Sequence, residues 1–224
     1  SQLIHDISIQ KLPVRFIIDR AGIVGEDGKT HNGLYDISIF TTIPNYTVIA
    51  PTTCNELIEA LEISKDFDDG PIAIRIPREI SFSLENDEKF QIGKWKEIKK
   101  GEKTLFIATG SMLKEILSID EQLKSKKIDG TIVSAASVKP LDEKYILDNL
   151  DKYDNIFVME EAYEKNSFGS SILDFINKRG IINKIAIENG IVPHGKRGEL
   201  LEEFGLKGEN LIKRIEEKID AGKK

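Results

Sequence analysis

The stretch Val14-Arg-Phe-Ile-Ile-Asp-Arg-Ala-Gly-Ile-Val-Gly-Glu-Asp-Gly-Lys-Thr-His-Asn-Gly33 joins an apolar, β-rich run to a segment dense in glycine and charge. Residues 19–33 hold four glycines, three acidic residues, two basic residues and one of the three histidines of the chain. Such a segment cannot form a core, and ordering its flexible backbone costs conformational entropy. A polar loop that follows a buried strand commonly presents its side chains to a ligand. We therefore expect a strand over residues 13–18 and a binding loop after it.

Length and composition set broad limits on this chain. Its 224 residues suffice for one large domain or two small ones, and its 40% hydrophobic and 31% charged residues are ordinary for a globular protein. No apolar run approaches the roughly 20 residues of a membrane helix, so we expect no membrane partner. The net charge of −6 argues against nucleic acid as the main partner, although local basic groups can still bind a small anion. The single Cys54 fits a reducing compartment, and we expect the cytoplasm.

Strand-like and helix-like segments alternate along the chain. The first half carries β-rich runs at residues 13–18, 46–50 and 71–76. Apolar residues at helical spacing predict a helix over 54–65, capped by Thr52 or Thr53. The second half carries strand-like runs at 104–108, 130–134, 155–159 and 183–187, and helix-like patterns at 112–124, 142–150, 169–178, 198–204 and 210–219. Strands separated by helices indicate right-handed crossovers, so the predicted fold is α/β, in two units with mainly parallel sheets flanked by helices.

A change in composition divides the chain. Charges cluster and apolar residues thin out around residues 79–103. We expect one unit over residues 1–88, a linker over 89–103 with short edge strands around 90–95, and a second unit over 104–224. The alternative is a charged surface excursion of a single domain. The first residues have helical spacing with no capping residue before them, which indicates that the chain is part of something longer.

Two arginines follow neighbouring strands of the predicted sheet. Arg20 comes just after the first run, and Arg78 comes just after the third. In open α/β sheets, ligands bind outside the carboxyl ends of the strands. Two guanidinium groups at that edge would clamp a phosphate, because each offers paired donors to a tetrahedral anion. The alternative is that each arginine simply pairs with a surface carboxylate.

Asp27 and His31 lie four residues apart in the glycine-rich segment. A carboxylate there can accept hydrogen bonds from substrate hydroxyls, and a histidine can move protons near neutral pH. The alternatives are an ordinary Asp-Gly turn and a histidine with a structural hydrogen bond. Taken one at a time, these structural alternatives are favoured.

Other kinds of site have less support. The segment lacks the G-x-G-x-x-G pattern, and no phosphate-binding G-x-x-x-x-G-K-[ST] motif occurs. Three scattered histidines and one cysteine show no metal-ligand spacing, so we expect no metal ligand and assign no cofactor-binding residue. Cys54 has no partner histidine nearby that would make it a nucleophile. In the second half, Glu160 and Glu161 end a strand, and His194 and Arg197 lie in a loop suited to an anion or to a contact between domains or subunits.

The combination of these features is more specific than any of them alone. Asp19-Arg-Ala-Gly-x-Val-Gly-x-Asp-Gly-x-Thr-His-x-Gly33 resembles the signature loop of the 1-deoxy-D-xylulose-5-phosphate synthases, whereas transketolases share its acidic-Gly-x-Thr-His core without the Asp-Arg-Ala-Gly lead. The resemblance covers essentially the whole chain. It continues through Pro71-Ile-Ala-Ile-Arg-Ile-Pro-Arg78, Ala108-Thr-Gly-Ser111, Val138-Lys-Pro-Leu-Asp142, Phe168-Gly-Ser170 and Pro193-His-Gly195. It implies part of a pyrimidine-binding domain followed by a transketolase-type C-terminal domain.

The resemblance also implies a reaction and roles for residues. The family uses thiamine diphosphate and magnesium to join pyruvate, with loss of carbon dioxide, to D-glyceraldehyde 3-phosphate, a step that leads to isoprenoids, thiamine and pyridoxal. By similarity, Arg20 and Arg78 would hold the phosphate of the acceptor. Asp27 would bind the acceptor as well, and His31 would act in catalysis as a proton shuttle. The full enzyme would be a homodimer.

The departures from the family pattern concern completeness. The family binds the cofactor diphosphate and magnesium with an N-terminal domain that lies upstream of position 1, and the glutamate and aromatic segment that hold the aminopyrimidine ring lie there too. We therefore expect this chain to need an N-terminal portion of the same enzyme and to be inactive alone. Glu79 replaces a glycine that is usual in the family. The alternatives are a subunit of a split transketolase or 2-oxoacid dehydrogenase β-type enzyme, and a non-catalytic assembly fragment.

Overall fold

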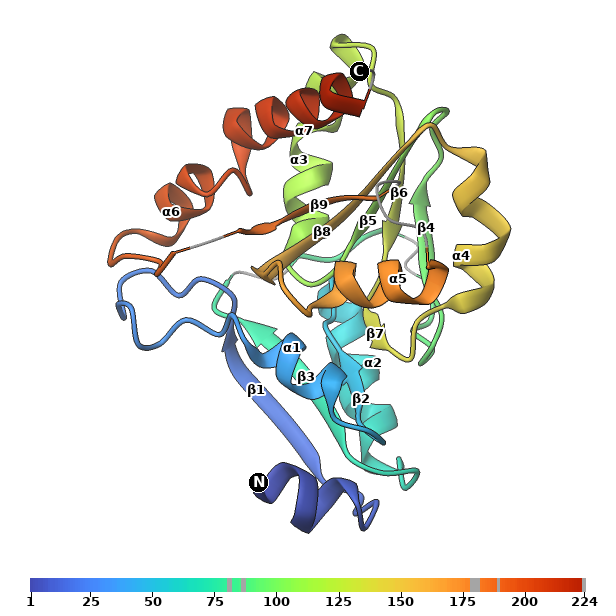
Figure 1. Ribbon diagram of the computed structural model, residues 1–224, viewed down its shortest axis with the longest axis vertical. Coiled ribbons are helices and arrows are strands. Elements are labelled where there is room, and N and C mark those ends of the chain that lie inside the picture. The colour runs from blue at the N-terminus through green and yellow to red at the C-terminus, as the bar shows by residue number, and fades with distance from the viewer. Residues whose placement is uncertain (80–81, 86–87, 178–181, 189, 223–224) are drawn as a thin grey trace.

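The computed structural model describes residues 1–79, 82–85, 88–177, 182–188 and 190–222. Within these residues the chain forms a four-stranded and a five-stranded sheet (Figure 1). The four-stranded sheet has the order β1-β3-β2-β7, with bounds β1 Arg15–Ala21, β2 Thr47–Ile49, β3 Ile72–Pro77 and β7 Ser137–Lys139. Strands β1, β3 and β2 run parallel, and β7 is antiparallel to β2. The second half of the chain therefore adds a strand to the sheet of the first half.

The five-stranded sheet is the core of the second half. Its order is β4-β6-β5-β8-β9, with bounds β4 Lys96–Lys99, β5 Thr104–Ala108, β6 Gly130–Ser134, β8 Asn155–Tyr163 and β9 Ile182–Ile187. All neighbours are parallel except β4, which lies antiparallel on the edge beside β6. Strands β5 and β6 are buried at every position, as expected of parallel strands covered by helices on both faces.

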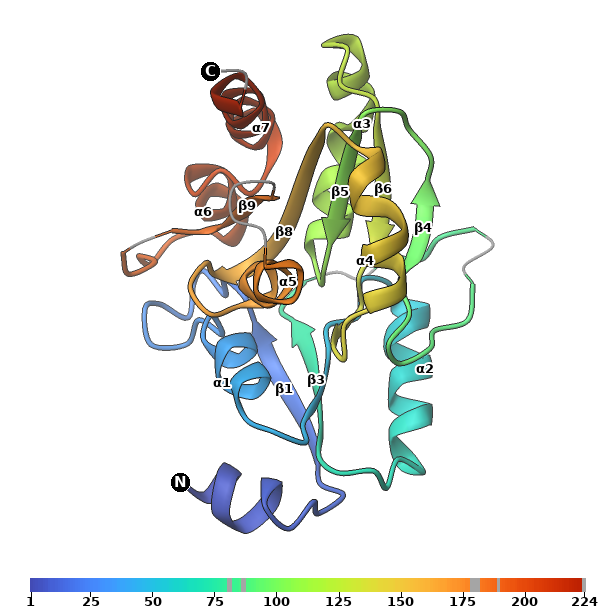
Figure 2. The ribbon, with the colours of Figure 1, turned by 45° about the vertical axis from the view of Figure 1, so that its right-hand side comes forward.

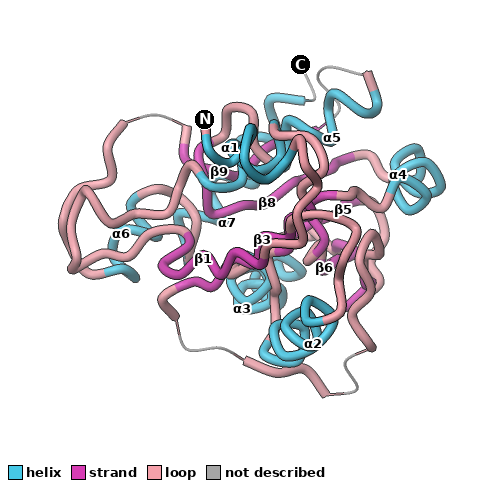
Figure 3. The backbone as a smooth tube through the Cα atoms, turned by 90° about the horizontal axis from the view of Figure 1, so that it is seen from below, coloured by secondary structure: helices cyan, strands magenta, loops and turns pink. Residues whose placement is uncertain are grey.

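Helices cover both faces of the strand layer. Their bounds are η1 Leu3–Ser8, α1 Asp36–Thr42, α2 Cys54–Lys65, α3 Met112–Ser125, α4 Glu143–Asn149, η2 Leu150–Lys152, α5 Phe168–Ile176, α6 Arg197–Glu203 and α7 Gly208–Gly222. Figures 2 and 3 show α1 and α2 on opposite sides of β3. One core cluster packs α3 and α7 against the second sheet, and another packs side chains of both sheets together with α1, α4 and α5. In the part of the chain described, no helix is both long and apolar enough to cross a membrane.

The predicted α/β architecture is confirmed, with local corrections. The helix over 54–65 and the strands over 104–108 and 130–134 occur with those bounds, and Thr53 is the N-cap of α2, where its side chain accepts from the Glu56 amide. The edge strand expected around 90–95 is wrong in position, because β4 begins at Lys96. Helix α1 and strand β7 were not predicted. The division at 1–88, 89–103 and 104–224 stays a prediction, although β4 within the proposed linker already belongs to the second sheet.

A buried ion pair joins the two halves. Lys96 Nζ on β4 lies 2.8 Å from Glu56 Oε1 on α2, and both side chains are almost fully buried. The other carboxylate oxygen accepts from the amide and hydroxyl of Thr52, each at 2.8 Å, and Ser134 Oγ donates to Oε1 at 2.9 Å. Every lone pair of this carboxylate thus has a donor, which a buried charge requires. The network holds the start of α2 against the second sheet.

We expect Lys96→Met to lower the free energy of unfolding by about 3 kcal/mol or more, because the buried carboxylate of Glu56 loses its counter-ion. The measurement is urea unfolding followed by circular dichroism. Lys144→Met is the control, since Lys144 and its partner Asp148 are both exposed, and it should change stability by less than about 1 kcal/mol. Equal losses from the two variants would contradict this account of the interface.

Candidate functional site

The backbone at the end of β1 places Arg20. The pairing of β1 with β3 becomes irregular between Asp19 and Ala21, so Arg20 stands outside the ladder with φ of +59°. This left-handed conformation is unfavourable for a non-glycine residue, and residues with such strained backbones are often found at functional sites. The expectation that Arg20 follows a buried strand is wrong in two respects: Arg20 is part of β1, and β1 is an edge strand whose Ile17 is half exposed. The bulge nevertheless sends Arg20 toward the loop.

Arg20, Arg78 and Asp27 form one charged cluster. Arg78 directly follows β3, as predicted. Its Nη1 lies 2.6 Å from Asp27 Oδ2, and Arg20 Nη1 lies 3.1 Å from the same oxygen. Both arginine side chains are nearly half exposed, at 44% and 48%, so they remain open to a ligand from solution. The structure therefore brings together three of the four residues that the sequence singled out.

The charges of this cluster act on Asp27. The close ion pair with Arg78 holds the pKa of the Asp27 carboxyl below its usual value of 3.8, and the charges of Arg20 and His31 act in the same direction. The carboxylate is therefore ionised at neutral pH. Two guanidinium groups against one carboxylate leave one positive charge in excess.

His31 lies on the exposed rim of the same loop. Its Nδ1 is 3.1 Å from the Thr30 hydroxyl, and its charge is close enough to lower the pKa of Asp27. The His31 amide donates to the Gly28 carbonyl at 3.2 Å, and the Gly28 amide donates to Gly25 at 3.0 Å. These turns give the loop an internal structure, with Asp27 and His31 on neighbouring turns.

The base of the loop is closed by glycine backbone. Gly22 and Gly33 exchange hydrogen bonds, at 2.7 Å from the Gly22 amide and 2.9 Å from the Gly33 amide. Gly22 has φ of +82°, and a Cβ atom there would lie 2.5 Å from the Glu161 carboxylate. Glycine is required here because both the backbone conformation and the space exclude a side chain.

Arg75 on β3 fixes the end of the loop. It is buried and makes a two-point ion pair with Asp36, from Nε at 2.6 Å and from Nη2 at 3.1 Å. Its Nη2 also donates to the Gly33 carbonyl at 3.1 Å. Charge-assisted, two-point contacts of this kind are strong and directional. Arg75 therefore ties the last residue of the loop to the first turn of α1.

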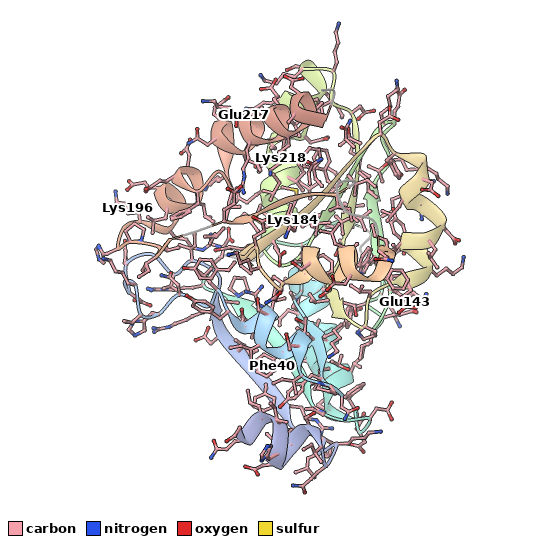
Figure 4. The ribbon with its side chains drawn as sticks, viewed as in Figure 1. Phe40, Glu143, Lys184, Lys196, Glu217 and Lys218 are labelled. Atoms are coloured by element: carbon pink, nitrogen blue, oxygen red, sulfur yellow. The ribbon has the colours of Figure 1, made fainter. Side chains whose placement is uncertain are left out.

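The loop that precedes α6 supports the glycine-rich loop from the second half of the chain. A Cβ atom at Gly25 would lie 2.7 Å from the Arg197 amide and 2.8 Å from the Gly195 carbonyl. The His194 ring faces Gly28 in the same way, at 4.0 Å from the position of a Cβ atom. Figures 1 and 2 show the two loops side by side, and Figure 4 places Lys196 at this end of the molecule. For the loop of His194 and Arg197, the sequence left open an anion site or a contact between domains or subunits. The structure contains a contact between the two halves of the chain.

Glu79 takes part in a charge network next to Arg78. Its Oε1 lies 2.8 Å from Lys114 Nζ, and its Oε2 lies 3.2 Å from Arg197 Nη2. Sequence reasoning noted Glu79 only as a departure from the family pattern. It missed the contribution of Arg75 and the buried partners of Arg197, because these contacts join residues far apart along the chain. The only feature of the sequence that pointed to these contacts was the high density of charged residues at the ends of the predicted strands.

The structure has two larger hollows away from this cluster. One of about 610 Å³ lies between β9, α6 and α7, and is lined by charged residues that include Glu188, Arg214 and Glu217. Another of about 130 Å³ lies between Thr52, Glu79 and Lys114. Neither is lined by Arg20, Asp27 or His31. Over the described ranges, no three or more His, Cys, Asp and Glu side chains are grouped so as to hold a metal ion.

Comparison with known proteins shows which family the chain belongs to. Residues 93–211 match the transketolase C-terminal domain, and residues 1–81 match the transketolase pyrimidine binding domain. The chain belongs to the transketolase family. A structure described as a split gene transketolase in an inactive β4 tetramer superimposes with a TM-score of 0.85 over 98% of this chain and 71% of that one, at 21% identity. A transketolase from Campylobacter jejuni superimposes with a TM-score of 0.76 over 94% of this chain and 32% of that one, at 24% identity.

Curated relatives narrow the resemblance. The chain is 63% identical over 227 residues to 1-deoxy-D-xylulose-5-phosphate synthase from Fusobacterium nucleatum, a match that covers all of this chain and 38% of that enzyme. It is 39% identical over 222 residues to the synthase from Thermotoga maritima, covering 96% of this chain and 35% of that enzyme. The resemblance inferred from the sequence is thus confirmed, and the chain spans little more than a third of these relatives.

We expect Arg78→Met to raise the pKa of Asp27 toward 3.8, because the ion pair with Arg78 contributes most to holding it down. Because the pKa is depressed, this pairing stabilises the fold in full only at pH values well above 3.8, and its contribution is lost as the pH falls through the lowered pKa. Carbon-13 NMR of the Asp27 carboxyl measures the value. Arg15→Met, a change at the start of β1 where the ion-pair partner is Asp68, is the control. An unchanged Asp27 pKa in Arg78→Met would contradict the pairing.

Proposed function

We propose that this chain is the C-terminal part of a 1-deoxy-D-xylulose-5-phosphate synthase, and that its glycine-rich loop binds D-glyceraldehyde 3-phosphate. The enzyme would join that aldehyde to pyruvate with release of carbon dioxide, a step toward isoprenoids and thiamine. The observation that carries the proposal is the approach of Arg20 and Arg78 to one oxygen of Asp27. The 63% identity to the Fusobacterium synthase supports this reading over a split transketolase or a 2-oxoacid dehydrogenase subunit.

The arginine pair suits a phosphate. Because both guanidinium groups already lie within 3.1 Å of one carboxylate oxygen, they can both reach one oxygen of a tetrahedral anion at that position. The excess positive charge favours a dianionic phosphate over the single carboxylate that now neutralises part of it. The half-exposed arginines allow the phosphate to enter from solution. Binding the phosphate would anchor the acceptor and restrict its aldehyde to one region of the site.

Asp27 and His31 would act on the rest of the acceptor. When the phosphate takes over the arginines, the Asp27 carboxylate becomes free to accept a hydrogen bond from the acceptor hydroxyl. His31 is exposed and close to Asp27, so its ring can deliver a proton to the aldehyde oxygen as the new carbon–carbon bond forms. A positioned proton donor at that oxygen stabilises the charge that develops there.

The cofactor is assigned to another part of the enzyme. The family implies thiamine diphosphate and a divalent metal. The described residues do not fit the metal, because they offer no grouped carboxylates to ligate it, and the loop presents arginines rather than metal ligands. We propose that thiamine diphosphate and magnesium are bound mainly by the upstream portion of the enzyme. No step of the chemistry at the cofactor is therefore assigned to this chain.

The open edge of the first sheet supports the proposal that the upstream portion of the enzyme binds this chain. Strand β1 ends the sheet, with no further strand beyond it among the residues described. Its Ile17 is half exposed, and Ile4, Ile9 and Leu12 around η1 are exposed as well. An open edge with apolar side chains favours further strand pairing. We propose that the upstream portion covers this face, that the full enzyme is a homodimer, and that it works in the cytoplasm.

We expect the double change Arg20→Met with Arg78→Met to raise the KM for D-glyceraldehyde 3-phosphate at least about 100-fold in the enzyme assembled with its upstream portion, since two charge-assisted contacts to the phosphate are lost. Steady-state kinetics with D-glyceraldehyde as the comparison acceptor provides the control, because that aldehyde carries no phosphate. Its KM should change by less than about threefold. Parallel changes for both acceptors would contradict a phosphate clamp.

For His31, we expect His31→Ala to slow carbon–carbon bond formation by about 100-fold or more, because the aldehyde oxygen loses its proton donor. Single-turnover measurements separate this step from the loss of carbon dioxide, which should keep its rate. A rate of bond formation equal to that of the unaltered enzyme would remove the proposed role.

A further inference from the structure

Two successive glutamates lie near the end of β8, the strand between β5 and the edge strand β9 of the second sheet. The pairing of β8 with β9 is irregular between Met159 and Tyr163, and Glu160 and Glu161 lie within this break. Both are essentially buried, with exposed fractions of 0% and 2%. Burial raises the pKa of each carboxyl, and hydrogen bonds oppose that shift. A buried carboxylate is costly unless it has several donors, so each requires a specific partner set.

The two carboxylates face different parts of the molecule. Glu160 accepts from the Ser167 hydroxyl and from the amides of Phe168 at 3.0 Å and Gly169 at 2.9 Å, so it caps the start of α5. Glu161 accepts instead from the amide of Ile23 at 2.6 Å. That amide belongs to the glycine-rich loop, 138 residues away in sequence.

Glu161 is held in place by groups of the second half of the chain. Its Oε2 lies 2.6 Å from Arg197 Nη2 and accepts from the hydroxyl of Ser111. Arg197 is also paired with Glu79, next to the phosphate-clamp residue Arg78. With one oxygen on the loop and the other on Arg197 and Ser111, the carboxylate has three donors and is satisfied as an anion.

The other end of the loop is attached to the same strand. The Tyr163 amide donates to the Leu34 carbonyl at 3.1 Å. Arg75 Nη2 contacts both the Gly33 carbonyl, at 3.1 Å, and the main-chain carbonyl of Glu161, at 3.3 Å. Both ends of the glycine-rich loop are therefore hydrogen-bonded to β8, the start through Ile23 and Glu161 and the end through Leu34 and Tyr163.

We propose that Glu161, held by Arg197, is a positioning residue through which the C-terminal unit sets the geometry of the acceptor loop. It does not touch the substrate in this account. It fixes the backbone at Ile23, four residues before Asp27 and eight before His31, relative to Arg78 at the end of β3. The inference rests on the proposed function of the loop, and it gives the C-terminal unit a role in acceptor selection beyond assembly.

Glu160 provides a matched control. Glu160→Gln and Glu161→Gln remove one charge each from adjacent buried positions of one strand, but only the second loses a carboxylate that contacts the loop. In the assembled enzyme we expect Glu161→Gln to raise the KM for D-glyceraldehyde 3-phosphate about tenfold, with the KM for pyruvate changed by less than about twofold. Arg197→Met should act in the same direction. Glu160→Gln should leave the acceptor KM within about twofold, whatever its effect on stability.

A second measurement separates this inference from the proposed function. In the isotopically labelled chain, Glu161→Gln should shift the NMR signals of the amides of Ile23, Gly25 and Gly28, whereas Glu160→Gln should not. If the unaltered enzyme fails to use the phosphorylated acceptor but these shifts occur, the proposed function fails and the structural link stands. Equal effects of both glutamine variants on the acceptor KM, or loop signals unmoved by Glu161→Gln, would overturn the positioning role.

Discussion

The hydrogen bond from the Ile23 amide to the buried Glu161 carboxylate is the contact on which the candidate site depends. It joins the start of the glycine-rich loop to strand β8 of the other sheet. Because the carboxylate is buried, losing a donor leaves a charge without compensation, so the contact resists breaking. Arg197 and Ser111 hold its other oxygen, and the loop is thereby attached to a rigid element. The polar loop is ordered by partners outside it, and this offsets the entropy of its glycines.

In the candidate site, two arginines placed by strands are paired with one carboxylate that lies on a loop. Arg20 and Arg78 are exposed at their tips but are placed by strands β1 and β3. Asp27 neutralises them only in part, and it lies on a loop that can adjust more easily than a strand. We propose that a phosphate replaces the carboxylate there without any movement of the sheet. The strained backbone of Arg20 is consistent with this arrangement, since the bulge brings its side chain to the loop rather than to the open edge.

The helices and strands that the sequence predicted correctly are those determined by residues close together along the chain. The Thr53 cap and the apolar spacing after it predicted α2 with its bounds, and buried apolar runs predicted β5 and β6. Helix α1 was missed because its seven residues carry too short a pattern, and β7 because its partner β2 lies about 90 residues earlier. The resemblance singled out the cluster of Arg20, Asp27 and Arg78. The role of Glu161 could not be predicted, since a contact across 138 residues leaves no pattern in neighbouring positions.

In the proposed function, the arginines at the ends of β1 and β3 receive the phosphate of the acceptor. A crystal structure of the enzyme assembled with its upstream portion, in complex with D-glyceraldehyde 3-phosphate, tests it most directly. We expect phosphate oxygens within about 3 Å of the guanidinium groups of both Arg20 and Arg78, with Asp27 displaced from one or both of them. A phosphate bound elsewhere, with both arginines still paired to Asp27, would contradict it.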